Sequence, residues 1–417
     1  MRCCLVLSFL TMWAPLTCVC PVVAGDELRV LKTSGDEFTL EVFDNSRTLS
    51  QALAINATGQ LIGLREVSDE AGTQLSQQPF FIDGQQASAI PLLEGYSNLE
   101  ISALSDTGLV VGYASRPIGH PQGSLTGFVW DSKTGKMTRL MPADRDVGCH
   151  AQSISADGTR ITGYTAGSEP SRMLPCLWTW NASEGAWAVE TLDTIQDVNP
   201  YIMSSSVLIS PDGQRIVACI TVAKLSDHVY DSSLHQWTHV DGQWQRELLS
   251  DEQMYLSDIN NAGQIAGITT TQRGRRPCMV DAAGQITLID LLPGDESGEA
   301  HGIDAAGTIV GFSDDPPGPL GGPQAFVWRR GATAPVTLPP GTTASMAFDI
   351  NDAGQIAGLV DVVRTAPAEK PQTPPEKSSA TDLDRDDGTA EVATTSAVDE
   401  ASVQTLAFRW TPKPGSK

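Results

Sequence analysis

One motif recurs seven times along this chain, and its spacing constrains the fold more than any other feature. Leu256 to Gly267 reads LSDINNAGQIAG, and Phe348 to Gly358 repeats it as FDINDAGQIAG. The central glycines of the seven copies are Gly59, Gly108, Gly158, Gly213, Gly263, Gly307 and Gly354, and they are separated by 49, 50, 55, 50, 44 and 47 residues. A period of about 40 to 50 residues indicates propeller blades or solenoid turns.

Each copy has the residue pattern of a β-hairpin turn. An apolar residue is followed by four turn residues, of which the first has a short polar side chain and the fourth is always glycine. A short polar side chain caps its own turn by accepting a backbone N–H two residues on, and glycine suits the left-handed position that ends such a turn. The repeat is therefore predicted to be a hairpin and not a pair of helices.

The seven units are predicted to form a closed ring of four-stranded blades. Two further apolar runs follow the hairpin in the first six units, whereas in the seventh only Thr411 to Lys417 follow Trp410, and two of these residues are prolines. The seventh unit therefore lacks a fourth strand after Trp410. Counting back from the first repeat by the spacing seen in the other units places Phe38 to Phe43 at the position of that strand. The sequence thus predicts an all-β, seven-bladed β-propeller closed by an N-terminal strand, with an open β-solenoid as the alternative.

The N-terminus has the composition of a secretory signal peptide. Residues 1–24 contain Arg2, a nearly uncharged apolar run and a Val22-Val23-Ala24 end, which predicts cleavage near Ala24. A transmembrane anchor of about 20 apolar residues is the alternative. We expect a secreted or periplasmic protein whose residues 25–417 form a single propeller domain with no membrane span, and we expect it to be a monomer.

Charge and cysteine content restrict the partners and cofactors. Without residues 1–24 the chain has 26 Lys and Arg against 50 Asp and Glu, which argues against nucleic-acid binding because that needs a basic surface. The cysteines that remain are Cys149, Cys176, Cys219 and Cys278. Their spacing matches no zinc pattern, so a disulfide or buried thiols are expected and neither a metal nor another cofactor is predicted.

The third apolar run of the units often ends in an aromatic residue. The recurring tryptophans are Trp130, Trp180, Trp237, Trp328 and Trp410. A stacking platform for a ligand is one interpretation, but packing between blades is favoured because the tryptophan recurs at one place per unit. The second glycine of the repeat, as in Gly267 and Gly358, similarly indicates close packing within a strand.

One connection is far longer than the others. Asp361 to Ser402 is rich in Pro, Ser and Thr, and has ten acidic against four basic residues, so we predict a disordered acidic insertion at about residues 361–402. The run Asp382 to Gly388 is similar to a calcium loop, but its glycine comes one place too late and the bidentate Glu is absent. A solvated linker is the favoured interpretation.

The candidate ligand-binding residues fall into two groups. His150, Asp258, His301 and Asp349 are predicted to flank or occupy the innermost strands, where they would converge near the channel. Arg273, Arg275 and Arg276 are placed in the variable loop after Thr269, where they would grip a carboxylate or phosphate or, as the favoured alternative, remain solvated beside Asp314 and Asp315. Because loops of varied length gather on the face opposite the repeated turns, we expect a ligand on that loop face.

The pattern Ile-Asn-x-x-Gly-x-Ile-x-Gly followed by Ala-Phe-x-Trp resembles the extracellular HAF repeat family of bacterial secreted proteins. The resemblance extends from Ala52 to Trp410, and the His-Ala-Phe of the family appears here as Gln324-Ala325-Phe326 and Leu406-Ala407-Phe408, without the histidine. It implies export and a propeller-like repeat, and it assigns no catalytic residue.

Two classes of function are compatible with these features. The favoured hypothesis is a secreted, non-catalytic binding module for a glycan, peptide or surface partner, meaning an extracellular or envelope glycan or protein. The alternative is a polysaccharide hydrolase or lyase with carboxylates or histidines from several blades at the channel mouth. No catalytic residue is assigned, because nothing resembles a nucleophile elbow, a phosphate loop or a zinc helix.

Overall fold

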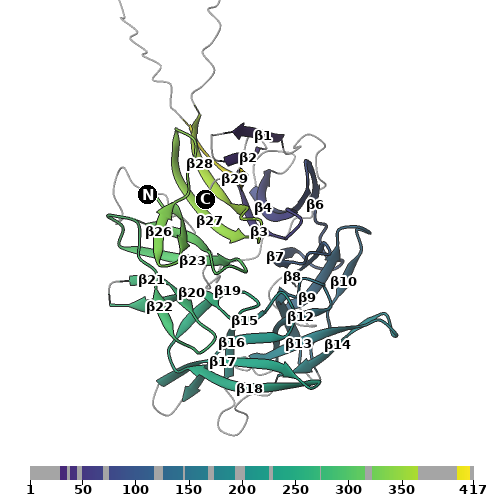
Figure 1. The fold of residues 1–417 in the computed structure, drawn as a ribbon. Helices are drawn as coiled ribbons and strands as arrows, with labels where there is room; N and C mark the ends of the chain where they lie inside the picture. The colour runs from purple at the N-terminus through teal and green to yellow at the C-terminus, as the bar shows by residue number, and fades with distance from the viewer. Residues whose placement is uncertain are drawn as a thin grey trace, which may run out of the picture.

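The chain folds into a ring of seven antiparallel β-sheets, as predicted (Figure 1). This computed structural model describes residues 29–34, 38–44, 49–68, 75–116, 125–143, 146–167, 173–192, 202–224, 229–272, 274–314, 322–364 and 402–413. None of these residues forms a helix long and apolar enough to span a bilayer. The predicted signal peptide lies outside the described residues.

Each of the first six blades has four consecutive strands, running from the axis outward. Blades one to three comprise β3 (Ser50–Ile55), β4 (Leu61–Ser68), β5 (Leu75–Asp83), β6 (Gln86–Ala89); β7 (Asn98–Leu104), β8 (Leu109–Ser115), β9 (Leu125–Asp131), β10 (Met137–Arg139); β11 (Gly148–Ile154), β12 (Arg160–Ala166), β13 (Met173–Asn181) and β14 (Ala186–Thr191). Blades four to six comprise β15 (Ile202–Ile209), β16 (Arg215–Lys224), β17 (Val229–Val240), β18 (Gln243–Ser250); β19 (Met254–Ile259), β20 (Ile265–Thr271), β21 (Gly274–Val280), β22 (Ile286–Leu288); β23 (Ser297–Ile303), β24 (Ile309–Asp314), β25 (Gln324–Arg329) and β26 (Ala332–Pro335).

Blade seven joins the two ends of the chain. Its order is β1-β2-β29-β28-β27, formed by β1 (Arg29–Ser34), β2 (Phe38–Asp44), β27 (Thr342–Ile350), β28 (Ile356–Arg364) and β29 (Ser402–Pro412). The predicted closing strand is therefore confirmed, and β1 adds an outer fifth strand. Arg409 of β29 donates from Nε to Glu41 of β2 at 2.7 Å and from Nη1 to the Gly59 carbonyl of blade one at 2.6 Å, so one buried guanidinium ties the closing strand to the neighbouring blade.

The repeated motif forms the hairpin between the first and second strands of every blade. Its fourth residue is a glycine with φ between 70° and 86° in all seven copies, a region that a side chain would strain. The first residue caps the turn as predicted: the Asn56 side-chain oxygen accepts the N–H groups of Thr58 at 3.1 Å and Gln60 at 2.9 Å.

The second glycine of the motif permits a β-bulge in the innermost strand. In six blades the pairing shifts by one residue directly after the residue that pairs with this glycine. A Cβ at Gly311 would lie 1.9 Å from the carbonyl oxygen of Glu299, so the backbones approach too closely for any side chain. Blade four has Ala218 at this position, and its bulge lies two residues earlier than in the other blades, at Ser205. Close packing around the glycine is thus confirmed.

Apolar side chains pack between neighbouring blades and form most of the core. Trp130, Trp237 and Trp328 are buried, as predicted for packing residues. Trp180 is 39% exposed and contacts Trp187, so its assignment to the core was wrong; Trp178, two residues earlier, fills that place. The four described cysteines are buried and form no disulfide with one another.

The long insertion begins later and ends earlier than predicted. Asp361 to Arg364 continue β28 and pair with Ser402 to Thr405 of β29, so the ends of the predicted disordered segment are strands. The Thr405 hydroxyl donates to the Asp361 carboxylate at 2.6 Å, and β-branched Val362 and Val363 favour the extended conformation. Residues 365–401, including the calcium-like run, lie outside the described residues.

Candidate functional site

The bulges give the axial channel a lining that differs from blade to blade. Each bulge leaves one residue of the inner strand unpaired, and bulges commonly re-aim side chains near functional sites. A cavity of about 240 Å³ on the axis is lined by residues from all seven inner strands. Among them are six bulge residues, one from each blade except blade four: Leu53, Ser102, Gln152, Ser257, His301 and Phe348. Sequence analysis identified only His301 in this set.

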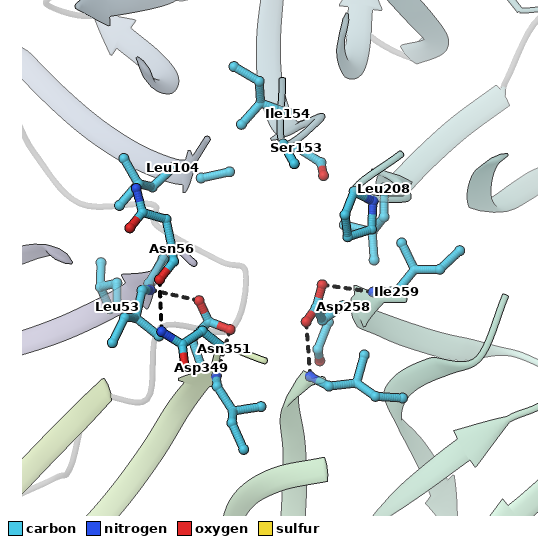
Figure 2. A pocket seen from close by; sticks show the side chains of 18 of the residues that line it. Leu53, Asn56, Leu104, Ser153, Ile154, Leu208, Asp258, Ile259, Asp349 and Asn351 are labelled. Carbon is cyan, nitrogen blue, oxygen red and sulfur yellow. Dashed lines mark hydrogen bonds between the residues drawn. The ribbon is translucent and has the colours of Figure 1, made fainter. Parts of the chain in front are cut away.

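Two carboxylates share one wall of this cavity (Figure 2). Asp258 accepts the N–H of Ile259 at 2.8 Å with one oxygen and that of Ile303, in the next blade, at 2.9 Å with the other. Asp349 likewise accepts the N–H groups of Ile350 at 2.7 Å and of Ile55, in blade one, at 2.8 Å. Inner strands are sheet edges with unpaired N–H groups, and these carboxylates satisfy two of them across blade boundaries.

Burial changes the protonation of both carboxyls. Removal from water raises the pKa of Asp258 to about 7, although its two N–H bonds oppose that change. The pKa of Asp349 is raised well above its ordinary value, first by burial and then by the negative charge of Asp258. Two like charges in one desolvated space disfavour each other. The pair therefore holds protons at a pH at which exposed aspartates are ionised.

The repeated turns also tie neighbouring blades together at one end of the cavity. The side-chain amides of Asn56, Asn260 and Asn351 donate to a backbone carbonyl in the next turn around the ring, at 2.9, 3.0 and 2.8 Å. Asp106 and Asp352 accept a backbone N–H from the adjacent turn, each at 2.8 Å, and both line the cavity. The cavity thus reaches the turn end of the channel, whereas we had expected a ligand on the opposite, loop face.

His301 lies between two phenylalanines and beside a buried ion pair. Its ring stacks on Phe312 and meets Phe348 edge to face, at centroid distances of 5.6 and 5.5 Å. Its Nε2 is 3.4 Å from the Glu299 carboxylate, which is paired with Arg275 of blade five. The imidazole is therefore held in place while it still lines the cavity.

Two of the predicted loop arginines lie in a strand. Arg275 and Arg276 belong to β21 and pair with Thr270 and Thr269, so their placement in a loop was wrong. The loop is shorter because β20 and β21 pair as far as Thr271 and Gly274. Arg275 pairs with Glu299, and Arg276 donates to the Ile289 carbonyl at 3.4 Å. Arg273 lies outside the described residues.

His150 occupies a separate buried cluster and does not line the cavity. Its Nδ1 is 3.2 Å from the Tyr164 hydroxyl, its Nε2 is 3.4 Å from the Ser102 hydroxyl, and its ring packs on Tyr113. Burial lowers its pKa to about 3, so the ring is neutral at ordinary pH. The structure therefore brings Asp258, His301 and Asp349 together and places His150, Arg275 and Arg276 elsewhere.

A second cavity, of about 330 Å³, lies at the outer edge of blade seven. It is lined by Thr33, Ser34, Phe38 and the segment from Thr337 to Pro340. Within the described part of the chain, no three His, Cys, Asp or Glu side chains gather in a way that would hold a metal ion.

Comparison with known proteins identifies the fold and leaves the ligand open. No protein-family profile and no curated protein sequence matches the chain. Among solved structures, a prolyl endopeptidase aligns over 75% of this chain and 45% of its own length, with 12% identity and a TM-score of 0.54. The β-propeller domain of the Trilobed protease from Pyrococcus furiosus (75% of this chain, 89% of that one, 10% identity, TM-score 0.49) and TolB from Acinetobacter baumannii (76% of each chain, 12% identity, TM-score 0.38) are also similar. The sheet topology shows that this chain is a seven-bladed β-propeller, and the similarity to the prolyl endopeptidase is a similarity of fold alone.

Proposed function

We propose that this protein is a secreted or periplasmic, non-catalytic binding module of the HAF repeat type, and that its ligand enters the axial cavity from the turn end. One observation carries the proposal. The turn residues and glycines that build the ring are repeated in nearly every blade, whereas the six described bulge side chains in the cavity are Leu, Ser, Gln, Ser, His and Phe. A uniform scaffold that presents a varied set of inward side chains is typical of a recognition surface.

The charge of the lining favours a basic peptide segment or protein loop among the possible ligands. Asp106 and Asp352 place negative charge at the turn end of the cavity, the partly protonated Asp258 and Asp349 add carboxyl oxygens, and no Lys or Arg is among its described lining residues. A Lys, an Arg or an N-terminal amine would match this potential. A glycan fits less well, because sugars need stacking surfaces and, besides the His301 ring, Phe348 is the sole aromatic side chain in the described lining.

The alternative function is polysaccharide hydrolysis, and Asp258 and Asp349 are the observation that favours it. Most glycosidases use two neighbouring carboxyl groups, one of which acts as a general acid because its pKa is raised. The raised pKa of Asp258 matches that pattern. Here, however, every oxygen of the pair already accepts a backbone N–H. Two of these four bonds connect neighbouring blades, so the carboxyls already have a structural role, which supports binding over catalysis.

A peptide-array experiment tests the proposal. A protein comprising residues 25–417 would be screened against matched basic and acidic peptides. The same screen would then be repeated with the Phe348→Ala and His301→Ala variants. We expect basic peptides to bind and each variant to weaken binding about tenfold or more, since central aromatic contacts dominate such interfaces.

The matched control is Lys133→Ala/Lys136→Ala, on the outer hairpin of blade two, which should bind normally. Binding that is insensitive to both cavity variants would place the ligand elsewhere. Release of reducing ends from polysaccharides by the wild type, with loss in Asp349→Asn, would instead establish the hydrolase.

A further inference from the structure

Only two of the seven inner strands carry a carboxylate directly before the apolar residue that ends the strand. The seven residues at this position are Ala54, Ala103, Ser153, Leu208, Asp258, Gly302 and Asp349. Asp258 connects blade five to blade six through the N–H of Ile303. Asp349 connects blade seven, the blade in which the ring closes, to blade one through the N–H of Ile55. The two carboxylates thus hold two blade boundaries.

Blade six leaves the space between the two carboxylates open. Its residue at this position is Gly302, where a Cβ would lie 2.7 Å from the Asp349 Cα and 3.0 Å from its Oδ1. At this position blade six therefore places no side chain between the two carboxylates. Figure 2 shows both directed into the same cavity.

The surrounding elements supply little positive charge. On β23 the ionisable groups are His301 and Glu299, and Glu299 is neutralised by Arg275 of β21. On β19 the only ionisable side chains are Asp258 and Tyr255, on β27 there is only Asp349, and β3 has none. The turns add Asp106, Asp304 and Asp352. Apart from His301 and the paired Arg275, the ionisable groups on these strands and turns are therefore carboxyls and the phenol of Tyr255.

We propose that Asp258 and Asp349 form a proton-operated clasp, which holds the blade five–six and blade seven–one boundaries tightly when the pair is protonated and loosens them when it is fully ionised. A proton on the oxygen that accepts the N–H of the following residue removes the repulsion and the cost of a buried charge at the loss of that one bond. The other oxygen still accepts the N–H across the blade boundary. Full ionisation places two negative charges in one desolvated wall of the cavity. The ring then reduces their repulsion by admitting water at the blade five–six and blade seven–one boundaries.

The direction of the pH effect follows from the pKa values. The folded pKa of Asp258 is raised to about 7 and that of Asp349 is raised as well, so the folded state holds protons that the unfolded chain releases above about pH 4. The contribution of the pair to stability therefore falls as pH rises from about 4 through about 7. His150 and His235, whose pKa values burial lowers, act in the opposite direction below about pH 6.5. For this reason the difference between variant and wild type is the measurement that isolates the clasp.

The test measures urea unfolding midpoints of the mature protein at several pH values between 5 and 8 and at constant ionic strength. The variants are Asp258→Asn, Asp349→Asn and the double variant, because asparagine keeps the shape and cannot ionise. We expect the midpoint of the double variant to rise relative to that of the wild type as pH increases. The matched control is Asp352→Asn, which likewise replaces a carboxylate that accepts an N–H across a blade boundary. This side chain is exposed, so no buried charge is removed and the midpoint should not rise above that of the wild type.

A difference that stays constant from pH 5 to pH 8 for the double variant would overturn the proposal. If the variants do not fold, infrared spectroscopy of the wild type replaces them. A protonated-carboxyl C=O stretch that is present near pH 6 and lost by pH 8 supports the clasp. Absence of that band at pH 6 refutes it.

Discussion

The bulge glycines allow a graded prediction about stability. A Cβ at Gly311 would lie 1.9 Å from the Glu299 carbonyl oxygen, whereas a Cβ at Gly267 would lie 2.7 Å from the Tyr255 carbonyl oxygen. Ordinary contacts begin near 3.4 Å. Gly311→Ala thus requires the two strands to separate by roughly 1.5 Å and Gly267→Ala by roughly 0.7 Å, and overpacking of a rigid site costs about 1–3 kcal/mol or more.

The expected losses differ between the two sites. At Gly311 the separation also disrupts strand hydrogen bonds worth about 1 kcal/mol each, so we expect Gly311→Ala to lower the free energy of unfolding by about 3–5 kcal/mol. At Gly267 a small shift of the backbone can accommodate the new methyl group. Alanine also lowers the conformational entropy of the unfolded chain, which stabilises the folded protein by about 0.4–1 kcal/mol. We therefore expect Gly267→Ala to lower the free energy of unfolding by about 1 kcal/mol. Ala218→Gly, in the blade whose bulge is displaced, should cost no more than about 1 kcal/mol.

Urea unfolding followed by tryptophan fluorescence measures all three variants, and an unchanged slope with denaturant verifies that the same transition is compared. Equal losses at Gly311 and Gly267, or a loss below about 1 kcal/mol at Gly311, would refute the argument that the carbonyl approach requires glycine. A smaller loss at Gly311 that is accompanied by weaker ligand binding would show that the bulge had moved and taken His301 with it.

Three further predictions concern closure, protonation and the insertion. Glu41→Gln should cost about 3 kcal/mol in urea unfolding, because it leaves the buried guanidinium of Arg409 without its anionic partner, and deletion of residues 25–44 should abolish the single cooperative transition seen by calorimetry. An unchanged midpoint in either variant contradicts the closure. His150→Gln should flatten the decline in melting temperature between pH 6.5 and pH 4, since the low folded pKa of His150 makes the wild type lose stability as pH falls through that range; parallel curves would exclude this. Replacing residues 365–401 with a short Gly-Ser linker should change stability by less than about 1 kcal/mol, because loop length enters only logarithmically, and a larger loss would indicate a docked segment.

The blade count and the ring closure could be predicted because their signals are local and repeated. A glycine at a left-handed position and a short capping residue identify each hairpin wherever it occurs in the chain. Phe38 to Phe43 could be assigned to blade seven because the strand count there fell short by one. The outer strand β1 has no such constraint, since no other blade has a fifth strand.

The cavity could be predicted only in part, because it depends on register and on contacts between blades. Asp258 and Asp349 precede a repeated turn, so their position near the axis could be read from the sequence. Their N–H partners, Ile303 and Ile55, belong to other blades, and no local pattern indicates them. The signal for the missed bulge residues was nevertheless present: in six blades the bulge residue lies three positions before the first turn residue, as Ser102 lies before Ser105 and Phe348 before Asn351.

Blade four shows how the bulge glycine of one blade affects a cavity-lining side chain of its neighbour. Its alanine at position 218 removes the close carbonyl approach, and the bulge moves to Ser205, so the inner strand pairs regularly at Val207. The N–H of Val207 is then taken by the side chain of Gln152, the bulge residue of blade three, at 2.9 Å. The absence of a glycine in blade four thus gives the bulge side chain of the neighbouring blade a structural bond. A bulge residue lies outside the strand pairing in each blade that keeps the glycine, so its side chain can differ between blades without changing the ring, which is the property on which the proposed binding role depends.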